Sequence, residues 1–229
     1  HYIPLGDHDI EAVVAEIERL KPDVVLNSIN GDSNIAFFHA LKDAGISAKE
    51  IPVISFSMGE TVLAQMHGDA DATGHYAVWN YFQSIDNQKN RDFIQAFQIR
   101  FGSDIPLSDP MEAAWLGVKL WAKAVRAAQT DDVGVIRTSI GHQSIVAPEG
   151  IVSIDHHSHH SWKTVRIGQI RSDGQFDILW TSAEPVRPDP FPPFISKPEA
   201  ALKLEQLYQA WGNQWAKPAS SNKSLGSRP

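Results

Sequence analysis

The residues best suited to chemistry in this 229-residue chain are polar side chains that follow apolar, strand-like segments. They are Asn30, Asp32, Ser57, Glu60, Asn80 and Tyr81. Together they supply hydrogen-bond donors, hydrogen-bond acceptors and an aromatic wall that excludes water. A small neutral molecule with a carbonyl oxygen and N–H groups needs that combination. Because consecutive parallel strands end at one edge of a sheet, we expect these side chains to share a crevice.

Each of these residues also has a purely structural interpretation. Asn and Asp after a strand commonly form turns or helix caps. Ser57 is placed to cap a helix that starts at Gly59, and aromatic residues in strands, such as Trp79 and Tyr81, are usually core residues. Only their convergence at one sheet edge favours binding.

Catalysis and metal binding find little support in the sequence. No G-x-S-x-G, P-loop or G-x-G-x-x-G pattern occurs, and the acidic residues lie mostly at surface positions of expected helices. We predict no enzyme and no cofactor. Four histidines fall within residues 155–160, but neighbouring side chains point to opposite faces, and no Cys or H-E-x-x-H motif completes a metal site. A solvated loop without metal is predicted there.

Composition excludes several classes of protein. The net charge of −7 argues against a nucleic-acid partner, because phosphate binding needs clustered Lys and Arg. The absence of cysteine removes thiol chemistry and suits an extracytoplasmic protein. No apolar run is long enough to span a bilayer. The first residues, 1–6, show no signal peptide and resemble the middle of a protein, so we expect a fragment of a longer fold.

Hydrophobic periodicity predicts an α/β fold in the first 74 residues. A helix over residues 10–20, capped by Asp7 or Asp9, precedes a strand over 24–26 that we expect to be buried on both faces. A helix over 35–45, a strand over 51–57 and a short helix over 59–66 follow. This alternation indicates a parallel sheet with right-handed crossovers.

The rest of the chain changes in texture. After a strand at 75–82 we predict packing helices over 90–101 and 110–128, the second using Ala114, Val118, Trp121 and Val125 as its buried stripe. A short helix over 131–140 has acidic residues at its start. From residue 144 onward the sequence is β-rich, with a hairpin turn at Asp173-Gly174. A proline-rich strap over 185–193, a helix from Pro198 and a disordered tail over 220–229 complete the prediction.

Several motifs together resemble the urea and short-chain-amide binding proteins of ABC transporters. The matching segments span about residues 1–195 and include residues 24–38, 79–86, 108–114, 147–150, 162–168 and 185–190. The amide sensor of amidase operons is similar over the same span. The resemblance implies a type I periplasmic-binding-protein fold, in which two α/β lobes joined by three crossing segments close on a ligand.

The resemblance also implies a division of the chain. Residues 1–74 form the distal lobe, 75–143 supply a crossover strand and helices of the first lobe, 144–184 return to the second lobe, and 185–229 form the strap, helix and tail. The N-terminal portion of the family fold is absent, so we expect an exposed apolar face that an N-terminal segment or second chain completes.

By position, the resemblance assigns ligand contacts to Asn30, Gly31, Ser57 and Met58, and less directly to Glu60. Asn80 and Tyr81 remain candidates from the sheet-edge argument, and Asp32 is expected to shape its loop, because a buried unpaired carboxylate is costly.

The expected function is an extracytoplasmic solute-binding protein that delivers urea or a short amide to an ABC permease. A sensor domain coupled to a signalling or transcription-regulating partner, cytoplasmic if it resembles the amide sensor, is the alternative, and the C-terminal extension favours it. An amidohydrolase lacks a nucleophile.

Overall fold

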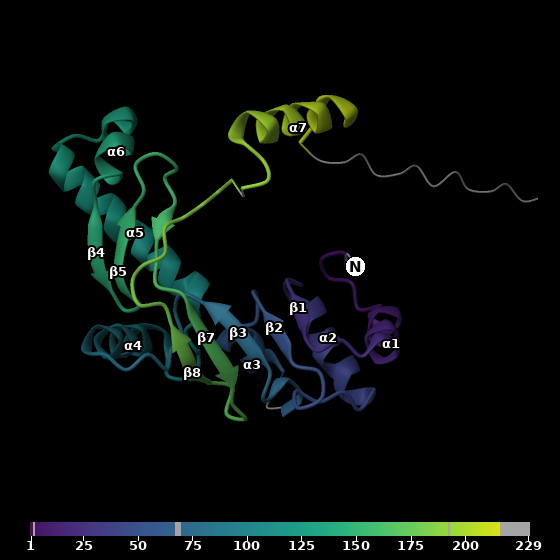
Figure 1. Ribbon diagram of the computed structural model, residues 1–229. Coiled ribbons are helices and arrows are strands. Elements are labelled where there is room, and N and C mark those ends of the chain that lie inside the picture. Colours follow the sequence, from purple (N-terminus) through teal and green to yellow (C-terminus); the bar gives the residue numbers. More distant parts are fainter. Residues whose placement is uncertain (2, 67–69, 192, 216–229) are drawn as a thin grey trace, which may run out of the picture. The chain divides into compact units, whose positions relative to one another are not determined.

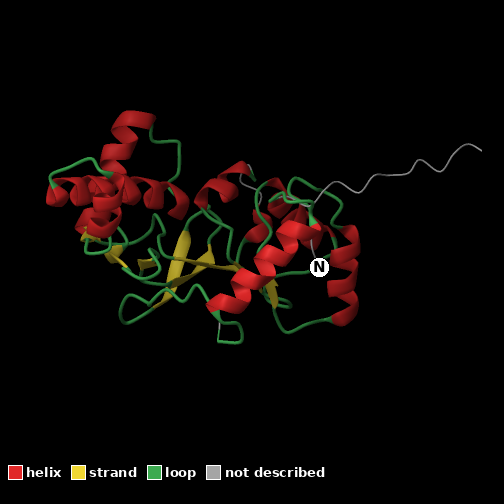
Figure 2. Ribbon diagram, turned by 90° about the horizontal axis from the view of Figure 1, so that it is seen from above, coloured by secondary structure: helices red, strands yellow, loops and turns green. Residues whose placement is uncertain are grey.

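The structure, a computed structural model, describes residues 1, 3–66, 70–191 and 193–215. The chain divides into two compact units, His1–Pro188 and Asp189–Pro229. The first unit mixes helices and strands, which confirms the predicted α/β class. In Figure 2 its strands run through the middle of the unit, and its helices gather toward both ends.

A five-stranded sheet organises the first unit (Figure 1). Its order is β1 (Val25–Asn27), β2 (Val53–Ser55), β3 (Tyr76–Trp79), β7 (Arg166–Ile170) and β8 (Phe176–Thr181). The first three strands are parallel, as predicted, and β7 and β8 are antiparallel to their neighbours. The parallel strands are joined through α2 (Asp32–Asp43), and then through α3 (Glu60–Gln65) with a 3₁₀ turn (Ala70–Ala72).

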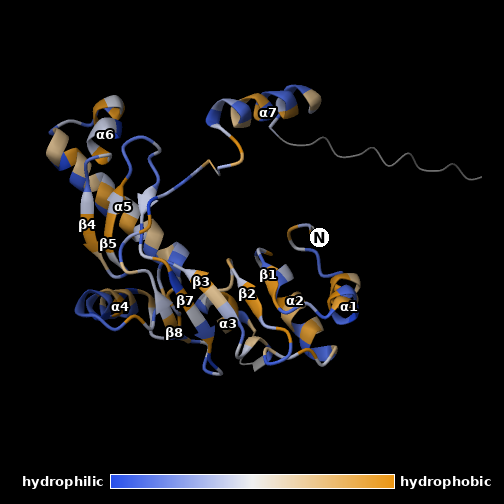
Figure 3. Cartoon of the chain, in the orientation of Figure 1, coloured by the Kyte–Doolittle hydropathy of each residue, from blue (hydrophilic) through white to orange (hydrophobic). Residues whose placement is uncertain are grey.

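The main core lies between one face of this sheet and the helices. Val53, Ser55 and Ala77 on that face have no exposed surface. Phe37 and Phe38 of α2 pack in the same cluster, together with Val14 and other apolar residues along α1 (Glu11–Leu20). Figure 3 shows hydrophobic colouring in strands and helices alike, and along the helices it alternates with hydrophilic colouring. Burial of this apolar area is the main force that holds the layers together.

Two predictions about the first elements were wrong. Helix α1 begins after Ile10 without a side-chain cap, because the Asp7 carboxylate instead accepts the backbone N–H of Asp9. Strand β1 is not buried on both faces, since Leu26 is 68% exposed. β1 is one of the two edge strands of the sheet, and the described residues leave the face that carries Leu26 uncovered.

A second, smaller core is formed by elements that follow β3 in the sequence. Its elements are α5 (Asp109–Ala128), α6 (Val133–Ile140), β4 (Ser144–Ala147), β5 (Gly150–Ile154) and β6 (Ser161–Trp162), with β4–β6 forming a separate antiparallel sheet. Leu116 and Leu120 pack there against Ala147 and Val152. Helix α4 (Gln88–Phe101) instead packs Phe93 and Phe97 on the main core. Asp132 caps α6, in agreement with the predicted acidic start.

The predicted buried stripe of α5 was wrong. Leu116, Leu120 and Ala124 form the buried stripe, whereas Val118 is 64% exposed and Trp121 is 53% exposed. The helix is apolar on two faces, so its periodicity alone does not select the partnered one. The other apolar face has no covering element among the described residues.

The last predicted elements are found where the structure describes them. Gly174 has a positive φ of 75° in the turn between β7 and β8, as the predicted hairpin requires. In the second unit, α7 (Lys197–Ala210) begins with a capping box between Ser196 and Glu199. The predicted tail at 220–229 lies outside the described residues. Among those described, no helix is both long and apolar enough to cross a bilayer.

A substitution at Gly168 tests how tightly the sheet packs on the core. An added Cβ there would lie 2.9 Å from Cζ of Phe82 and 3.1 Å from Cβ of Phe176, both fully buried. We predict that Gly168→Ala lowers the free energy of unfolding by about 1–3 kcal/mol through overpacking, measured by guanidinium chloride denaturation. Gly117→Ala is the matched control, because Gly117 lies in α5 with open space around it, and it should stabilise by about 0.5–1 kcal/mol. Equal effects of the two substitutions would contradict the packing described here.

Candidate functional site

The carboxyl ends of β1 and β2 form the edge where the sequence places its candidate ligand residues. Asn27 and Ser55, the last residues of these strands, are paired in the parallel register. The loops that follow them carry Asn30, Gly31 and Ser57. The predicted convergence of these two strand ends is therefore present.

A buried network of neutral polar groups fixes the two loops. The Asn27 Nδ2 donates to Asn34 Oδ1 at 2.8 Å and to Ser55 Oγ at 3.0 Å, while Asn27 Oδ1 accepts the Ile29 N–H at 2.8 Å. Asn34 Nδ2 donates to the Ile29 carbonyl at 2.6 Å and to Ser57 Oγ at 3.1 Å. Both side-chain amides are thus fully used. These hydrogen bonds fix the positions of the two loops relative to each other.

The outer residues of the edge are Asn30, Gly31 and Ser57. Asn30 is exposed, and its side-chain amide donates to the Ser28 carbonyl at 3.2 Å. Gly31 caps α2 without a side chain, with φ of 65° and ψ of −147°, a backbone geometry that favours glycine. Ser57 is half-buried, and its hydroxyl donates to the Ile29 carbonyl. Asp32 is exposed in the first turn of α2.

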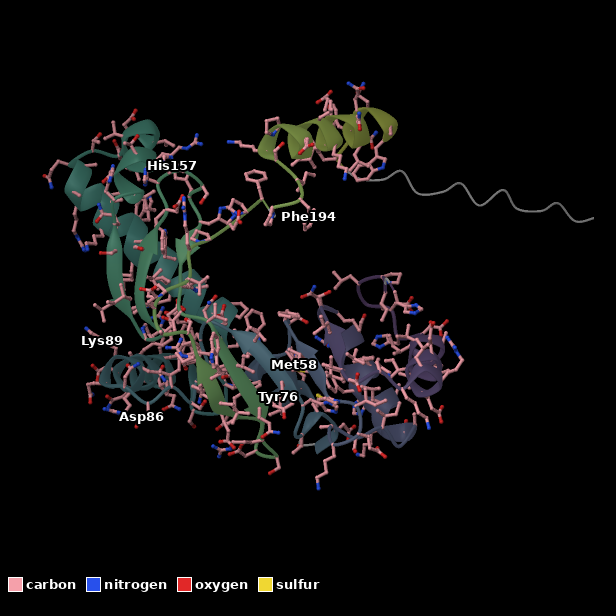
Figure 4. The ribbon with its side chains drawn as sticks, viewed as in Figure 1. Met58, Tyr76, Asp86, Lys89, His157 and Phe194 are labelled. Atoms are coloured by element: carbon pink, nitrogen blue, oxygen red, sulfur yellow. The ribbon has the colours of Figure 1, made fainter. Side chains whose placement is uncertain are left out.

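The remaining candidates lie inside the molecule. Met58, labelled in Figure 4, is buried, and its carbonyl accepts the Trp79 Nε1 proton at 2.6 Å. Glu60 is 1% exposed and accepts the Gln83 N–H at 2.6 Å. Tyr81 is fully buried and donates from its hydroxyl to Asn90 Oδ1 at 2.8 Å. The hydrogen bonds of these residues connect one element of the fold to another.

Asn80 belongs to a second polar site that the sequence interpretation missed. Its Nδ2 donates to the Thr164 carbonyl at 2.9 Å, and its backbone N–H donates to Asp109 Oδ2 at 3.1 Å. The charged side chains of this site, which we call the junction cluster, are Asp109, Glu112, Glu149, Lys163 and Arg166. They come from α5, the β4–β5 turn, and the segment that leads into β7.

Hydrogen bonds tie the junction cluster to the backbone of several elements. Asp109 Oδ2 also accepts the Tyr81 N–H at 2.8 Å. The Arg166 guanidinium donates to the Asn80 carbonyl and, at 2.7 Å, to the Glu149 carbonyl. Lys163 Nζ lies 2.8 Å from Glu149 Oε1. The cluster therefore joins the end of β3, the start of α5 and the β4–β5 turn.

Within the junction cluster, Glu112 is the side chain whose pKa shows the effect of burial most plainly. It has no exposed surface, and neither of its carboxyl oxygens has a hydrogen-bond partner among the described residues. Burial, with the nearby Glu149 carboxylate, raises the pKa of Glu112 to about 8. Burial likewise raises the pKa of Glu60 to about 7. A sequence signal existed, since Glu112 precedes Leu116 and Leu120 at four-residue spacing on the buried face of α5.

Comparison with known families gives the site its context. The family described as "Periplasmic binding protein domain" matches residues 1–197. The chain belongs to this family. Because the match covers most of the chain, the described fold of the first unit is that of the family.

Solved structures of periplasmic binding proteins agree in fold. A solute-binding protein of an ABC transporter from R. palustris, in complex with benzoate, is 22% identical with a TM-score of 0.70. The match covers 82% of this chain and 50% of that one. An amino acid ABC transporter substrate-binding protein from Pseudomonas fluorescens Pf-5 is 19% identical with a TM-score of 0.71, and covers 82% and 51% respectively. The neighbours are type I periplasmic binding proteins, as the sequence predicted, and this chain spans about half of their length.

Two curated relatives are also only partly covered. The "Leu/Ile/Val-binding protein homolog 6" of Brucella melitensis is 23% identical over 175 residues, which are 73% of this chain and 44% of that protein. A protein of Geobacillus stearothermophilus named "Limonene hydroxylase" is 35% identical over 123 residues, 54% of this chain and 22% of that protein. Most of the protein that bears the hydroxylase name lies outside the residues that match this chain.

The buried carboxyl group of Glu112 predicts a pH-dependent stability. Its pKa in the folded state lies above the ordinary value of 4.5, so the fold binds this proton more tightly than the unfolded chain does. Stability must then fall as pH rises from about 4.5 through about 8. Glu112→Gln stays neutral, so we expect the variant to gain about 1–3 kcal/mol relative to the parent between pH 5 and pH 8.5.

Guanidinium chloride denaturation at several pH values measures this difference. Glu184→Gln is the control, because it removes an exposed carboxyl group instead of a buried one, and we expect it to change stability by much less. A pH-independent difference for Glu112→Gln would mean that Glu112 is ionised in the folded protein.

Proposed function

We propose that the protein carrying this chain is an extracytoplasmic solute-binding protein that captures urea or a short-chain amide and delivers it to an ABC permease. Membership of the periplasmic binding protein family supports solute binding as the general role. Lobe closure around the solute supplies the recognition signal, because contacts made only in the closed state shift the population toward it. The permease recognises the surface of the closed state.

The lack of cationic side chains at the strand edge is the observation that favours a neutral ligand. Residues 27–34 and 55–59 contain amides, hydroxyls and backbone groups but no Lys or Arg, and Asp32 is their one charged residue. A benzoate or an amino acid brings a carboxylate, which needs a cationic or well-placed donor partner. A neutral amide needs only paired donors and acceptors, which Asn30, Gly31 and Ser57 provide.

In this proposal the buried candidates act indirectly. Met58, Glu60, Asn80 and Tyr81 hold the loops and crossing segments that place Asn30, Gly31 and Ser57. We place β1–β3, β7 and β8 in the distal lobe, and α5, α6 and β4–β6 in the other lobe, because Ala147 and Val152 pack on α5. This proposal differs from the expected division, which put residues 75–143 in the first lobe and 144–184 in the distal lobe. The junction cluster then lies where the segments cross between the lobes.

Calorimetric titration tests the ligand assignment. The protein that contains this chain is titrated with urea, acetamide, benzoate and leucine, and we expect heat of binding with urea or acetamide. Asn30→Ala should weaken that binding about tenfold, the equivalent of one hydrogen bond at about 1.4 kcal/mol, without loss of stability. Gln95→Ala, which removes an exposed amide on α4, should leave the affinity unchanged. Binding of benzoate or leucine alone would overturn the ligand assignment and leave the fold intact.

A ligand-sensing receptor domain is the second candidate, and one observation favours it. The proline-rich strap leads into a separate unit whose helix α7 is capped and has no buried residue. A helix of that kind suits a connection to a signalling partner. In a sensor, ligand should change the hydrogen exchange of α7, whereas in a transport protein α7 should exchange alike with and without ligand.

We further propose that the open apolar face of α5, with Val118 and Trp121, is covered in the whole protein by the remainder of the family fold. The solved relatives contain about as many residues again outside the match. Val146 and Ile151 in the neighbouring sheet are also more than half exposed. Exposed apolar area of this kind is characteristic of an interface.

The 229-residue chain alone should therefore self-associate, and Trp121→Lys should shift it toward the monomer. Sedimentation velocity over a range of concentrations measures the effect. Ile99→Lys, which changes an 80% exposed apolar residue on α4, should not alter association. A wild-type chain that stays monomeric at every concentration would contradict the proposed interface.

A further inference from the structure

A pocket of about 230 Å³ lies between the end of α6 and the loop that joins β5 to β6. It is lined by Arg137, Thr138, His142, His156 and His159. Figure 4 shows His157, from the same loop, beside α6. This pocket lies outside the strand edge and the junction cluster, and the proposed function does not use it.

Close backbone contact holds the two walls of the pocket together. A Cβ on Gly141 would lie 3.1 Å from Cα of His156, so glycine lets the loop approach the end of α6. The rings of His142 and His156 are stacked, with centroids 6.3 Å apart and planes 15° apart. His157 packs on His156 with ring centroids 3.8 Å apart. The imidazoles are thus grouped by the fold as well as by the sequence run.

The pocket is lined by potential cations and by no carboxylate. Arg137 has no ion-pair or hydrogen-bond partner for its guanidinium among the described residues. The nearest acid along the loop, Asp155, is engaged within the loop itself. Its Oδ1 accepts the N–H groups of His157 at 3.1 Å and Ser158 at 2.8 Å, and those hydrogen bonds, the one from Ser158 foremost, lower its pKa to about 2.

The surrounding charged and titratable groups come from three segments. The end of α6 contributes Arg137 and His142, and the loop contributes Asp155 and the four histidines at 156, 157, 159 and 160. The strap contributes Arg187, whose Nε lies 3.9 Å from Asp155 Oδ2.

We propose that this pocket binds a phosphate-type oxyanion. The planar guanidinium of Arg137 offers paired donors that match phosphate oxygens, and the imidazoles add further N–H donors. A transition metal ion is the competing ligand for grouped histidines. Among the described residues no group of three His, Cys, Asp or Glu side chains is arranged to hold one, so the geometry favours the anion.

The test is titration of the 229-residue chain with inorganic phosphate at pH 5.5, followed by calorimetry. We expect saturable binding of phosphate. Arg137→Gln and the double variant His142→Gln/His156→Gln should each weaken it fivefold or more. Arg100→Gln on α4 and His8→Gln are the matched controls and should not change the affinity. All altered side chains are exposed, and circular dichroism verifies that each variant is folded.

Vesicle co-sedimentation separates the sources of the phosphate group. Binding at pH 5.5 to phosphatidylglycerol vesicles, absent with phosphatidylcholine vesicles and reduced by Arg137→Gln, would support the pocket with a lipid headgroup as its ligand. The proposal is overturned if neither phosphate nor the anionic vesicles bind, or if Arg137→Gln binds as the parent does. Zinc binding that depends on His142 and His156, without phosphate binding, would also overturn it.

Discussion

The hydrogen bonds between the Asp109 carboxylate and the backbone N–H groups of Asn80 and Tyr81 constrain the rest of the molecule. They fasten the start of α5 to the end of β3, where the main sheet gives way to the second core. Arg166 completes the junction by binding the Asn80 and Glu149 carbonyls. Buried charges of this kind hold only when each is hydrogen-bonded or paired, which makes the positions of these segments specific. The carboxyl oxygens of Glu112 have no such partner among the described residues, and burial, which raises its pKa to about 8, favours its neutral form.

At the strand edge, the buried polar groups that need hydrogen-bond partners are neutral. Asn27 and Asn34 satisfy one another and the two loops, so their burial leaves no unpaired donor in these side chains. A rigid, uncharged support of this type presents backbone and side-chain groups without imposing a net charge on what binds. The contrast with the charged junction is physical. The junction cluster holds segments in place across two cores, whereas the strand edge, in the proposed function, keeps outward-facing groups available for a ligand.

Much of the fold follows from sequence because local patterns and tertiary structure agree. The periodicity of α1, the apolar strands β1 and β2, and the Asp173-Gly174 turn each specify one structure. The prediction for α5 was wrong because the helix has two apolar faces, and which one is buried depends on elements distant in sequence. Leu26 was misjudged for the same reason, since exposure of an edge strand depends on what covers it. The convergence of Asn30 and Ser57 was predictable from parallel topology, whereas the inward direction of Glu60 and Tyr81 depends on packing that spacing does not encode.

The two uncovered apolar regions and the open strand edge have a common cause. A crevice that desolvates a small solute needs two opposing surfaces, and a chain that spans about half of its solved relatives can supply only one complete wall of it. The same division leaves Val118 and Trp121 of α5 exposed, since the strands that would cover them belong to the other half in this interpretation. In the proposed function, apolar burial and ligand capture are therefore completed by the same surface. A change that disturbs the docking of α5 should thus affect ligand affinity as well as association, even though α5 lies away from Asn30 and Gly31.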